Sequence, residues 1–346
     1  MYSYLTTEGT VMRKKLNIHI KIVFGLILVL LVVFPGCGDK QNKEWYRIYG
    51  GVIGGSFSQF ANGIKHIVNN KETDIKISVV ASAGSVENTR RVNNEENALG
   101  VVFASESSLG YHGQEAFANE DPKTNIRMVT LLYYAYGQFS TLKNSHIHQF
   151  EDIVGEKIAC GTTGSGTAKT LERLAISAGI WEKFTPIYRG GTAGAQTLQD
   201  GQVKGFFWLV SVPNSAIIEL TAIKRIRMLD LDTPAKKYGF YEKYPFYFPT
   251  KLPEGSYEGK VESVKTIAMP TVLIANKSVS EETVYRLLKH VYTEEGHKHM
   301  LQTTQAAADM TVENAPHAFV IPLHKGAYKF WNEQGVDIPE RAMPVD

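Results

Sequence analysis

Cysteine is scarce in this sequence, and neither sign of charge is in excess. Two cysteines among 346 residues provide neither a disulfide framework nor the four thiolates of a zinc site. With 37 basic and 35 acidic side chains, the net charge of +2 is too small for a typical nucleic-acid-binding protein. Apolar residues make up 43% of the chain and charged residues 21%. This balance excludes a disordered, fibrous or multi-span membrane chain and leaves a globular protein of about two domains.

Long hydrophobic runs are also lacking. The apolar run at residues 22–34 has 13 residues, whereas a membrane-spanning helix needs about 20. A basic cluster at residues 13–15 precedes it, which is the pattern of a secretory signal. Because that cluster directly follows Met12, we expect residues 1–11 to reflect an early start codon.

The apolar run ends at Gly36-Cys37, and a small residue before cysteine resembles the bacterial lipoprotein cleavage site. We therefore expect residues 1–36 to be a lipoprotein-type signal peptide, Cys37 to be lipidated, and residues 37–45 to be a polar tether. The alternative is an uncleaved N-terminal anchor.

The signal accounts for the small positive charge of the whole chain. Residues 1–36 carry four basic side chains and one acidic side chain, so 33 basic and 34 acidic groups remain after cleavage. One lipid chain binds a bilayer only marginally, whereas two or more anchor a protein stably. We expect a body in the periplasm or at the outer face of the cytoplasmic membrane, attached to the membrane through a lipid only.

Strand and helix patterns alternate along the body. Residues 78–103 and 188–208 both read as strand, glycine turn, helix and strand. This alternation predicts α/β domains with mainly parallel sheets. The expected strands are 46–49, 75–80, 99–103, 128–136, 157–160, 187–188, 205–210 and 267–274. The expected helices start near residues 57, 85 and 168, after the turn at 190–192, and at Pro213 as the first helical residue. Segments 281–300 and 318–331 are expected to be helical or mixed, and 232–260 irregular.

We expect two lobes, each a mainly parallel sheet flanked by helices, with a ligand cleft between them. Lobe I comprises residues 46–140 plus 255–346, and lobe II comprises residues 141–254. Glycine-rich turns follow several of the strands in both lobes. Ligands of such sheets bind at the carboxyl ends of strands, beside helix N-termini.

The turn at residues 161–167 (GTTGSGT) is the sharpest candidate site. It follows a strand and opens a helix, so its N–H groups and hydroxyls favour a carboxylate or similar small anion. A nucleotide P-loop needs lysine directly after the last glycine, and here Thr167 stands there. The dinucleotide fingerprint also fails, because Lys169 occupies a glycine or alanine position. The alternative is a plain helix cap.

Two earlier turns are similar in type. In residues 50–58 (GGVIGGSFS), glycines allow close approach to the backbone, Ser56 offers a hydroxyl, and Phe57 covers an apolar part or belongs to the core. In residues 83–88, Ser85 and Asn88 lie one turn apart on one helix face, although N-capping alone explains Ser85.

Catalytic and metal-binding signatures are missing from the sequence. No G-x-S-x-G motif occurs, and we expect no catalytic residue, metal site or cofactor. Cys160 fits a buried apolar position. The H-x-H pairs at 146–148 and 297–299 lack metalloprotease spacing and are expected to be solvated or structural. The aromatic segment 238–248 fits the core and the lobe crossover, or alternatively the cleft.

An ordered set of motifs resembles a known family. Its members are residues 49–57, GSVEN at 84–88, ALGVV at 98–102, GSGT at 164–167, the segment 198–207, YPFY at 244–247, GSYEG at 255–259 and IPLHKGA at 321–327. Together these resemble the TAXI group of substrate-binding proteins of TRAP transporters, over roughly residues 46–335.

The resemblance implies a periplasmic-binding-protein-like fold that closes on a small organic anion, such as 2-oxoglutarate or a glutamate-like carboxylate. The partners it implies are TRAP-type membrane permease subunits, with no nucleic acid. A ligand-sensing lipoprotein that feeds a membrane sensor is the alternative, and an enzyme is less favoured. The candidate ligand-binding residues are Gly54, Ser56, Phe57, Ser85, Asn88, Tyr133, Gly164, Ser165, Gly166, Thr167, Phe207 and Trp208.

Two positions depart from the family's pattern. Relatives often carry Gln-x-Asp after the third strand, where this chain has residues 103–106 (FASE). Relatives also commonly have an acidic residue after the tyrosine of the fourth strand, and here Tyr133 is followed by Tyr134 and Ala135. These departures remove a group that would receive a ligand's amino nitrogen, and they favour a non-aminated or more apolar carboxylate.

Overall fold

The structure, a computed structural model, describes residues 43–257 and 261–345, so the predicted signal and Cys37 lie outside the described residues. Within the described part, the chain forms one compact unit. None of its helices is both long enough and apolar enough to cross a membrane.

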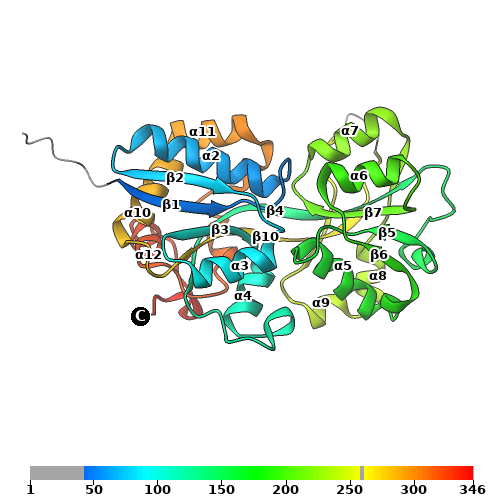
Figure 1. The fold of residues 1–346 in the computed structure, drawn as a ribbon, viewed down its shortest axis with the longest axis horizontal. Helices are drawn as coiled ribbons and strands as arrows, with labels where there is room; N and C mark the ends of the chain where they lie inside the picture. The colour runs from blue at the N-terminus through cyan, green and yellow to red at the C-terminus, as the bar shows by residue number, and fades with distance from the viewer. Residues whose placement is uncertain (1–42, 258–260, 346) are drawn as a thin grey trace, which may run out of the picture. The chain divides into compact units, whose positions relative to one another are not determined.

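A single ten-stranded sheet organises the described chain (Figure 1). Its strand order is β2-β1-β3-β10-β4-β7-β5-β6, with β8 paired to β4 and β9 paired to β10. The strands at both ends of the sheet pair in parallel: β1 pairs with β2 and β3, and β5 pairs with β6 and β7. The strands are β1 (Glu44–Tyr49), β2 (Ile75–Val80), β3 (Ala98–Phe103), β5 (Lys157–Ala159), β6 (Thr185–Ile187), β7 (Gly205–Val210), β8 (Ile226–Met228) and β9 (Phe248–Lys251).

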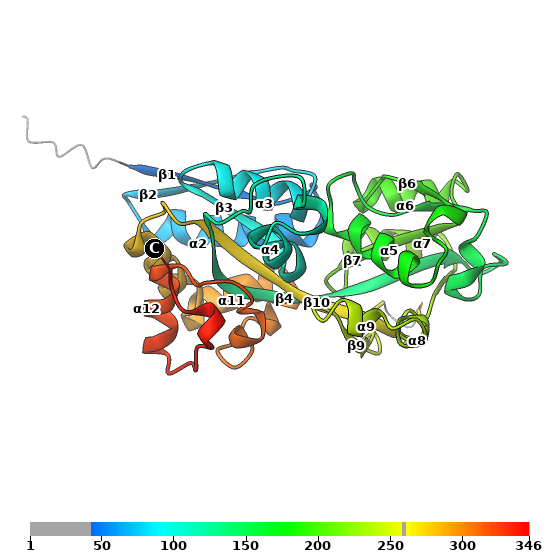
Figure 2. The same cartoon turned by 90° about the horizontal axis from the view of Figure 1, so that it is seen from below.

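Two long antiparallel strands join the ends of the sheet. β4 (Ile126–Leu142) pairs with β10 (Lys265–Asn276) along its first part and with β7 along its last part. Figure 2 shows β4 passing from the first half into the second, whereas β10 runs along the first half and lies beside β9 near the middle. We call β1–β3 with their helices the first half, and β5–β7 with their helices the second half.

Helices cover the sheet in both halves. Because of this cover, every residue of β3 (ALGVVF) and β7 (GFFWLV) is buried, and these strands are uniformly apolar. The first half carries α2 (Ser56–Lys71), α3 (Ser85–Asn94), α4 (Ala104–Tyr111), α10 (Glu281–Val291), α11 (Glu294–Thr303) and α12 (Lys325–Glu333). The second half carries α5 (Gly166–Ser177), α6 (Gly191–Gln199) and α7 (Ser215–Ile223), followed by α8 (Asp232–Lys237) and α9 (Phe240–Lys243).

The predicted α/β fold with mainly parallel ends is confirmed, but three local expectations were wrong. Pro213 does not begin a helix, because Asn214 caps α7 by accepting the Ala216 N–H. Segment 232–260 is not wholly irregular, since it holds α8, α9 and β9. The predicted cap Ser85 is the first helical residue, after Gly84 at φ 125°. The lobe boundaries stay a prediction.

Candidate functional site

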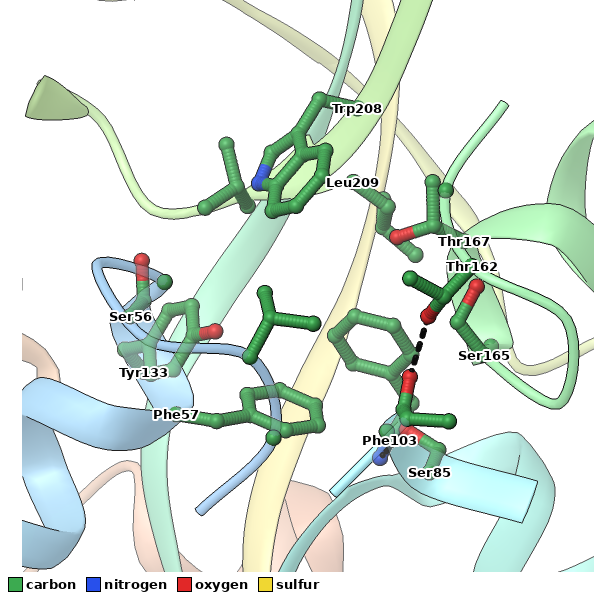
Figure 3. A pocket seen from close by; sticks show the side chains of 18 residues that line it. Ser56, Phe57, Ser85, Phe103, Tyr133, Thr162, Ser165, Thr167, Trp208 and Leu209 are labelled. Carbon is green, nitrogen blue, oxygen red and sulfur yellow. Dashed lines mark hydrogen bonds between the residues drawn. The ribbon is translucent and has the colours of Figure 1, made fainter. Parts of the chain in front are cut away.

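A cavity lies where the carboxyl ends of the parallel strands of both halves meet (Figure 3). The empty space between its walls, which includes open solvent, is about 410 Å³. The first half contributes turns after β1 and β2 and the last residue of β3, and β4 contributes Tyr133. The second half contributes the turn after β5 and the end of β7. The lining residues are Gly51, Val52, Gly55, Ser56, Phe57, Ala83, Gly84, Ser85, Phe103, Tyr133, Gly161, Thr162, Ser165, Gly166, Thr167, Trp208, Leu209 and Val210.

No residue lining this cavity has a charged side chain. Its polar groups are hydroxyls, one indole N–H and backbone amides, and its walls are aromatic. Phe57 and Phe103 meet edge to face at 4.9 Å between ring centroids. Burial raises the pKa of the Tyr133 hydroxyl, so the phenol stays neutral and can donate a hydrogen bond. A ligand here is therefore held by neutral donors and apolar contacts.

The turn after β5 is positioned by its own hydrogen bonds. Ser165 is the N-cap of α5, and its hydroxyl accepts the Ala168 N–H at 3.1 Å. This is the helix-cap role that the sequence had left as the alternative. The Thr167 hydroxyl, by contrast, turns toward the cavity in Figure 3. Of the two hydroxyl-bearing candidates in this turn, Thr167 is the one with a hydroxyl free to face a ligand.

A buried ion pair stands behind the same turn. Glu106 of α4 pairs with Arg173 of α5 at 2.8 Å, and both side chains are buried. Arg173 also binds Glu115 and donates to the hydroxyl of Tyr247 at 3.0 Å. A methyl group built on Gly166 would lie 2.5 Å from Phe103 Cδ2 and 2.8 Å from Glu106 Oε2, so a larger residue there would displace both side chains. The pair links the two halves and places a compensated carboxylate close to the start of α5.

Direct hydrogen bonds also join the halves around the cavity. The hydroxyls of Ser56 and Ser211 are 2.6 Å apart, and the Thr162 hydroxyl donates to the Ala83 carbonyl at 2.6 Å. These bonds join the start of α2 to the end of β7, and the turn after β5 to the turn after β2. The structure therefore represents a conformation in which the halves are in contact.

Eight of the twelve predicted ligand-binding residues line the cavity. They are Ser56, Phe57, Ser85, Tyr133, Ser165, Gly166, Thr167 and Trp208. Ligand binding by these residues stays a prediction, but the structure brings them together from five segments of the chain.

Four predicted residues do not line the cavity. Phe207 is fully buried and its ring packs toward Phe139, because alternate side chains of a strand point to opposite faces. Asn88 donates to the carbonyls of Tyr49 and Val101 and ties α3 to the sheet. Gly54 and Gly164 neighbour the lining, and their carbonyls accept the Ser215 hydroxyl and the Glu87 N–H.

Sequence reasoning also missed lining residues, notably Phe103, Thr162 and Leu209. Phe103 ends β3, and the position of that strand end in a parallel sheet was a usable signal. Thr162 stands within the turn already singled out. Leu209 follows Trp208 at the end of β7. Because every residue of this strand is apolar, its sequence does not indicate which side chains face a cavity.

The other residues weighed from sequence have structural roles. Burial raises the pKa of Cys160 to about 12, so its thiol stays protonated, as expected of a buried apolar position. His146 lies 3.1 Å from Glu156, and His299 stacks on His66. In segment 238–248, Tyr247 is buried against Arg173 and does not line the cavity. Among the described residues, no cluster of three or more histidine, cysteine or acidic side chains is placed to hold a metal ion.

Residues 48–335 match the NMT1-like family. The chain belongs to the NMT1-like family. This match covers most of the chain, including every residue that lines the cavity.

Solved structures similar to this NMT1-like protein include two that are named as periplasmic binding proteins. MatC from Rhodopseudomonas palustris, solved with bound malate, is 14% identical with a TM-score of 0.53, covering 84% of this chain and 98% of its own. The periplasmic binding protein BugD is 13% identical with a TM-score of 0.50, covering 84% and 94%. The aliphatic sulphonate binding protein SsuA from Escherichia coli is 15% identical with a TM-score of 0.43, covering 86% and 95%. At these identities, the first two matches establish a shared fold.

Proposed function

We propose that this protein is an exported solute receptor that holds a small organic anion in the cavity and delivers it to a membrane permease. The observation that carries the proposal is the cavity itself. Turns that follow parallel strands of both halves form it, and bonds such as Thr162 to Ala83 join the halves beside it. A ligand that touches both halves stabilises the state in which they are in contact.

A carboxylate without an amino group is the ligand that this lining favours. Backbone N–H groups at helix starts and the hydroxyls of Thr167 and Tyr133 are donors, which suits an anion. The lining contains no Asp or Glu, so the ammonium of an amino acid would have no charged partner. We therefore place 2-oxoglutarate-like and malate-like acids ahead of glutamate. The malate bound in MatC supports this choice of class.

The test identifies the ligand without assuming it. Protein purified under native conditions is denatured, and the released small molecules are identified by mass spectrometry. Calorimetric titration then measures malate, 2-oxoglutarate and glutamate. We expect the two non-aminated acids to bind at least tenfold more tightly than glutamate. Release of an uncharged molecule, with no binding of any of the three acids, would contradict the proposal.

We further propose that the receptor is of the TAXI type and serves a TRAP permease, as the ordered motifs of the sequence suggest. Its deletion should then abolish cellular uptake of the ligand found above, and a plasmid copy should restore it. Unchanged uptake in the deletion strain would exclude the transport role and favour a sensory one.

Export with lipid attachment at Cys37 completes the proposal. Cells labelled with a fatty-acid analogue should tag the wild-type protein and spare the Cys37→Ala variant. Cys160→Ala is the matched control, because that thiol is buried in the folded body. Equal labelling of wild type and Cys37→Ala would show that the anchor is attached elsewhere or is absent.

A further inference from the structure

The helices that begin around the cavity differ in what covers their N-termini. In α5 the Ser165 hydroxyl caps the first turn. In α3 the first turn contains Glu87, whose carboxylate accepts the Ala83 N–H at 2.7 Å. The ring of Trp208 lies over the start of α6, where a methyl group built on Gly191 would be 3.2 Å from Cη2. A protein side chain thus already lies at each of these three helix starts.

The start of α2 is different. This helix has 16 residues, its N-cap is Gly55, and neither a capping side chain nor an acidic residue occurs in its first turn. Within the described residues, the amide N–H groups of Ser56 and Phe57 have no hydrogen-bond partner. Both residues line the cavity. Unpaired N–H groups and the helix dipole together favour a negative charge at this place.

A second donor lies beside that helix start. Trp208 is 6% exposed, and its indole Nε1–H is buried with no hydrogen-bond partner in the described structure. Cζ2 of this ring would lie 3.9 Å from a methyl group built on Gly55 and 3.8 Å from one built on Gly191, so the ring lies between the starts of α2 and α6. Cζ2 is bonded to Cε2, the carbon that carries Nε1. In Figure 3 the indole nitrogen is on the side of the ring toward Ser56, away from Thr167. A buried donor without an acceptor is costly, and a bound acceptor would remove that cost.

We infer that the carboxylate of the ligand binds at the start of α2, with the Trp208 indole N–H and the amide N–H groups of Ser56 and Phe57 as its donors. This inference rests on the proposed function and specifies its ligand site. The main anion subsite is then at the start of α2 and not at the α5 turn. In the α5 turn the Ser165 hydroxyl caps its own helix, and the Glu106 carboxylate lies nearby. The Thr167 hydroxyl then faces the opposite end of the ligand.

The indole donor is tested with Trp208→Phe, which keeps an aromatic ring and removes the N–H. Trp181→Phe is the matched control, because Trp181 lies outside the cavity. Affinities for malate and 2-oxoglutarate are measured by calorimetry. We expect Trp208→Phe to bind about 10- to 100-fold more weakly, the range for one hydrogen bond to a charged group. Trp181→Phe should bind as the wild type does.

A spectroscopic measurement separates the hydrogen bond from packing. In wild-type protein labelled with ¹⁵N at the indole nitrogens, the Trp208 resonance is the one missing from Trp208→Phe. It should shift downfield on saturation with malate or 2-oxoglutarate. If it does not shift, or if Trp208→Phe binds within a factor of two of the wild type, the inference is wrong although the receptor function stands. If the wild type binds neither acid, both the inference and the proposed carboxylate function fail.

The backbone donors are tested at Ser56, the first residue of α2. Proline is well tolerated at this helix position, and Gly55 before it is already extended at φ −81° and ψ 160°. Ser56→Ala removes the hydroxyl alone, whereas Ser56→Pro removes the hydroxyl and the N–H. We expect Ser56→Pro to bind at least tenfold more weakly than Ser56→Ala at similar thermal stability. Equal affinities of the two folded variants would exclude the Ser56 amide as a donor.

Discussion

At the scale of single residues, two hydroxyls of one turn have different tasks. Ser165 caps α5, whereas Thr167 faces the cavity. Ser165→Ala should therefore lower the free energy of unfolding by about 1 kcal/mol, as loss of an N-cap does. Thr167→Val keeps the shape and should weaken binding of the ligand by roughly tenfold with unchanged stability. Calorimetric titration and urea unfolding of both variants check this, and the reverse assignment of effects would contradict it.

A second residue makes stability depend on pH. His324 caps α12 by accepting the Gly326 N–H, and its other ring nitrogen contacts the Val279 carbonyl. Burial lowers the pKa of His324 to about 4 from the ordinary 6.5. Between pH 6.5 and pH 4, His324 is protonated in the unfolded chain but neutral in the folded chain. The free energy of unfolding therefore falls as the pH falls from 6.5 toward 4. The loss from this residue is roughly 2 to 3 kcal/mol by pH 4.5.

His324→Asn isolates that contribution, because asparagine also caps helices but does not titrate. Urea unfolding at pH 7 and pH 4.5 should show a smaller acid loss in the variant than in the wild type, by about 2 kcal/mol. His148→Asn, at an exposed position, is the control. Equal acid losses in wild type and His324→Asn would show that His324 is protonated without cost in the fold.

At the scale of elements, the contact between α4 and α5 depends on one buried ion pair. Arg173 and Glu106 lie 67 positions apart in the chain and are almost completely buried. Arg173→Met leaves the Glu106 carboxylate buried without its partner, which should cost about 3–5 kcal/mol of unfolding free energy. Adding Glu106→Gln to this variant should recover part of the loss.

Urea unfolding of the single and double variants measures this coupling. Lys143→Met is the control, because the Lys143–Glu262 pair is exposed and such pairs contribute little. If Arg173→Met is no less stable than Lys143→Met, α4 and α5 are held together by other contacts.

At the scale of the whole molecule, β10 and β4 are the described strands that lie between β3 of the first half and β7 of the second. The other links between the halves beside the cavity are side-chain and turn contacts such as Ser56 to Ser211. We expect these contacts to open without ligand and to close with it. Small-angle scattering should therefore show a smaller radius of gyration at saturating ligand. The same radius in both conditions would contradict closure.

Much of this architecture follows from the sequence. The spacing of apolar residues and the glycine-rich turns together locate most strands. Because the turns that follow parallel strands lie at one edge of the sheet, eight of the predicted residues meet at the cavity. The direction of individual side chains could not be predicted from the sequence. Phe207 and Trp208 are adjacent aromatic residues, yet Phe207 packs into the core and Trp208 lines the cavity. The Arg173–Glu106 pair was also out of reach, because no local pattern couples residues that meet only across the two halves.

The uncharged lining has a consequence for how ligand binding responds to ionic strength. Mobile ions weaken attraction between exposed charges, but they act little on short hydrogen bonds from buried amide and indole groups. A carboxylate held at such donors, with no Lys, Arg or His among the lining residues, keeps its affinity when external salinity rises. Capture then depends on the concentration of the solute and hardly on the ionic strength of the surroundings.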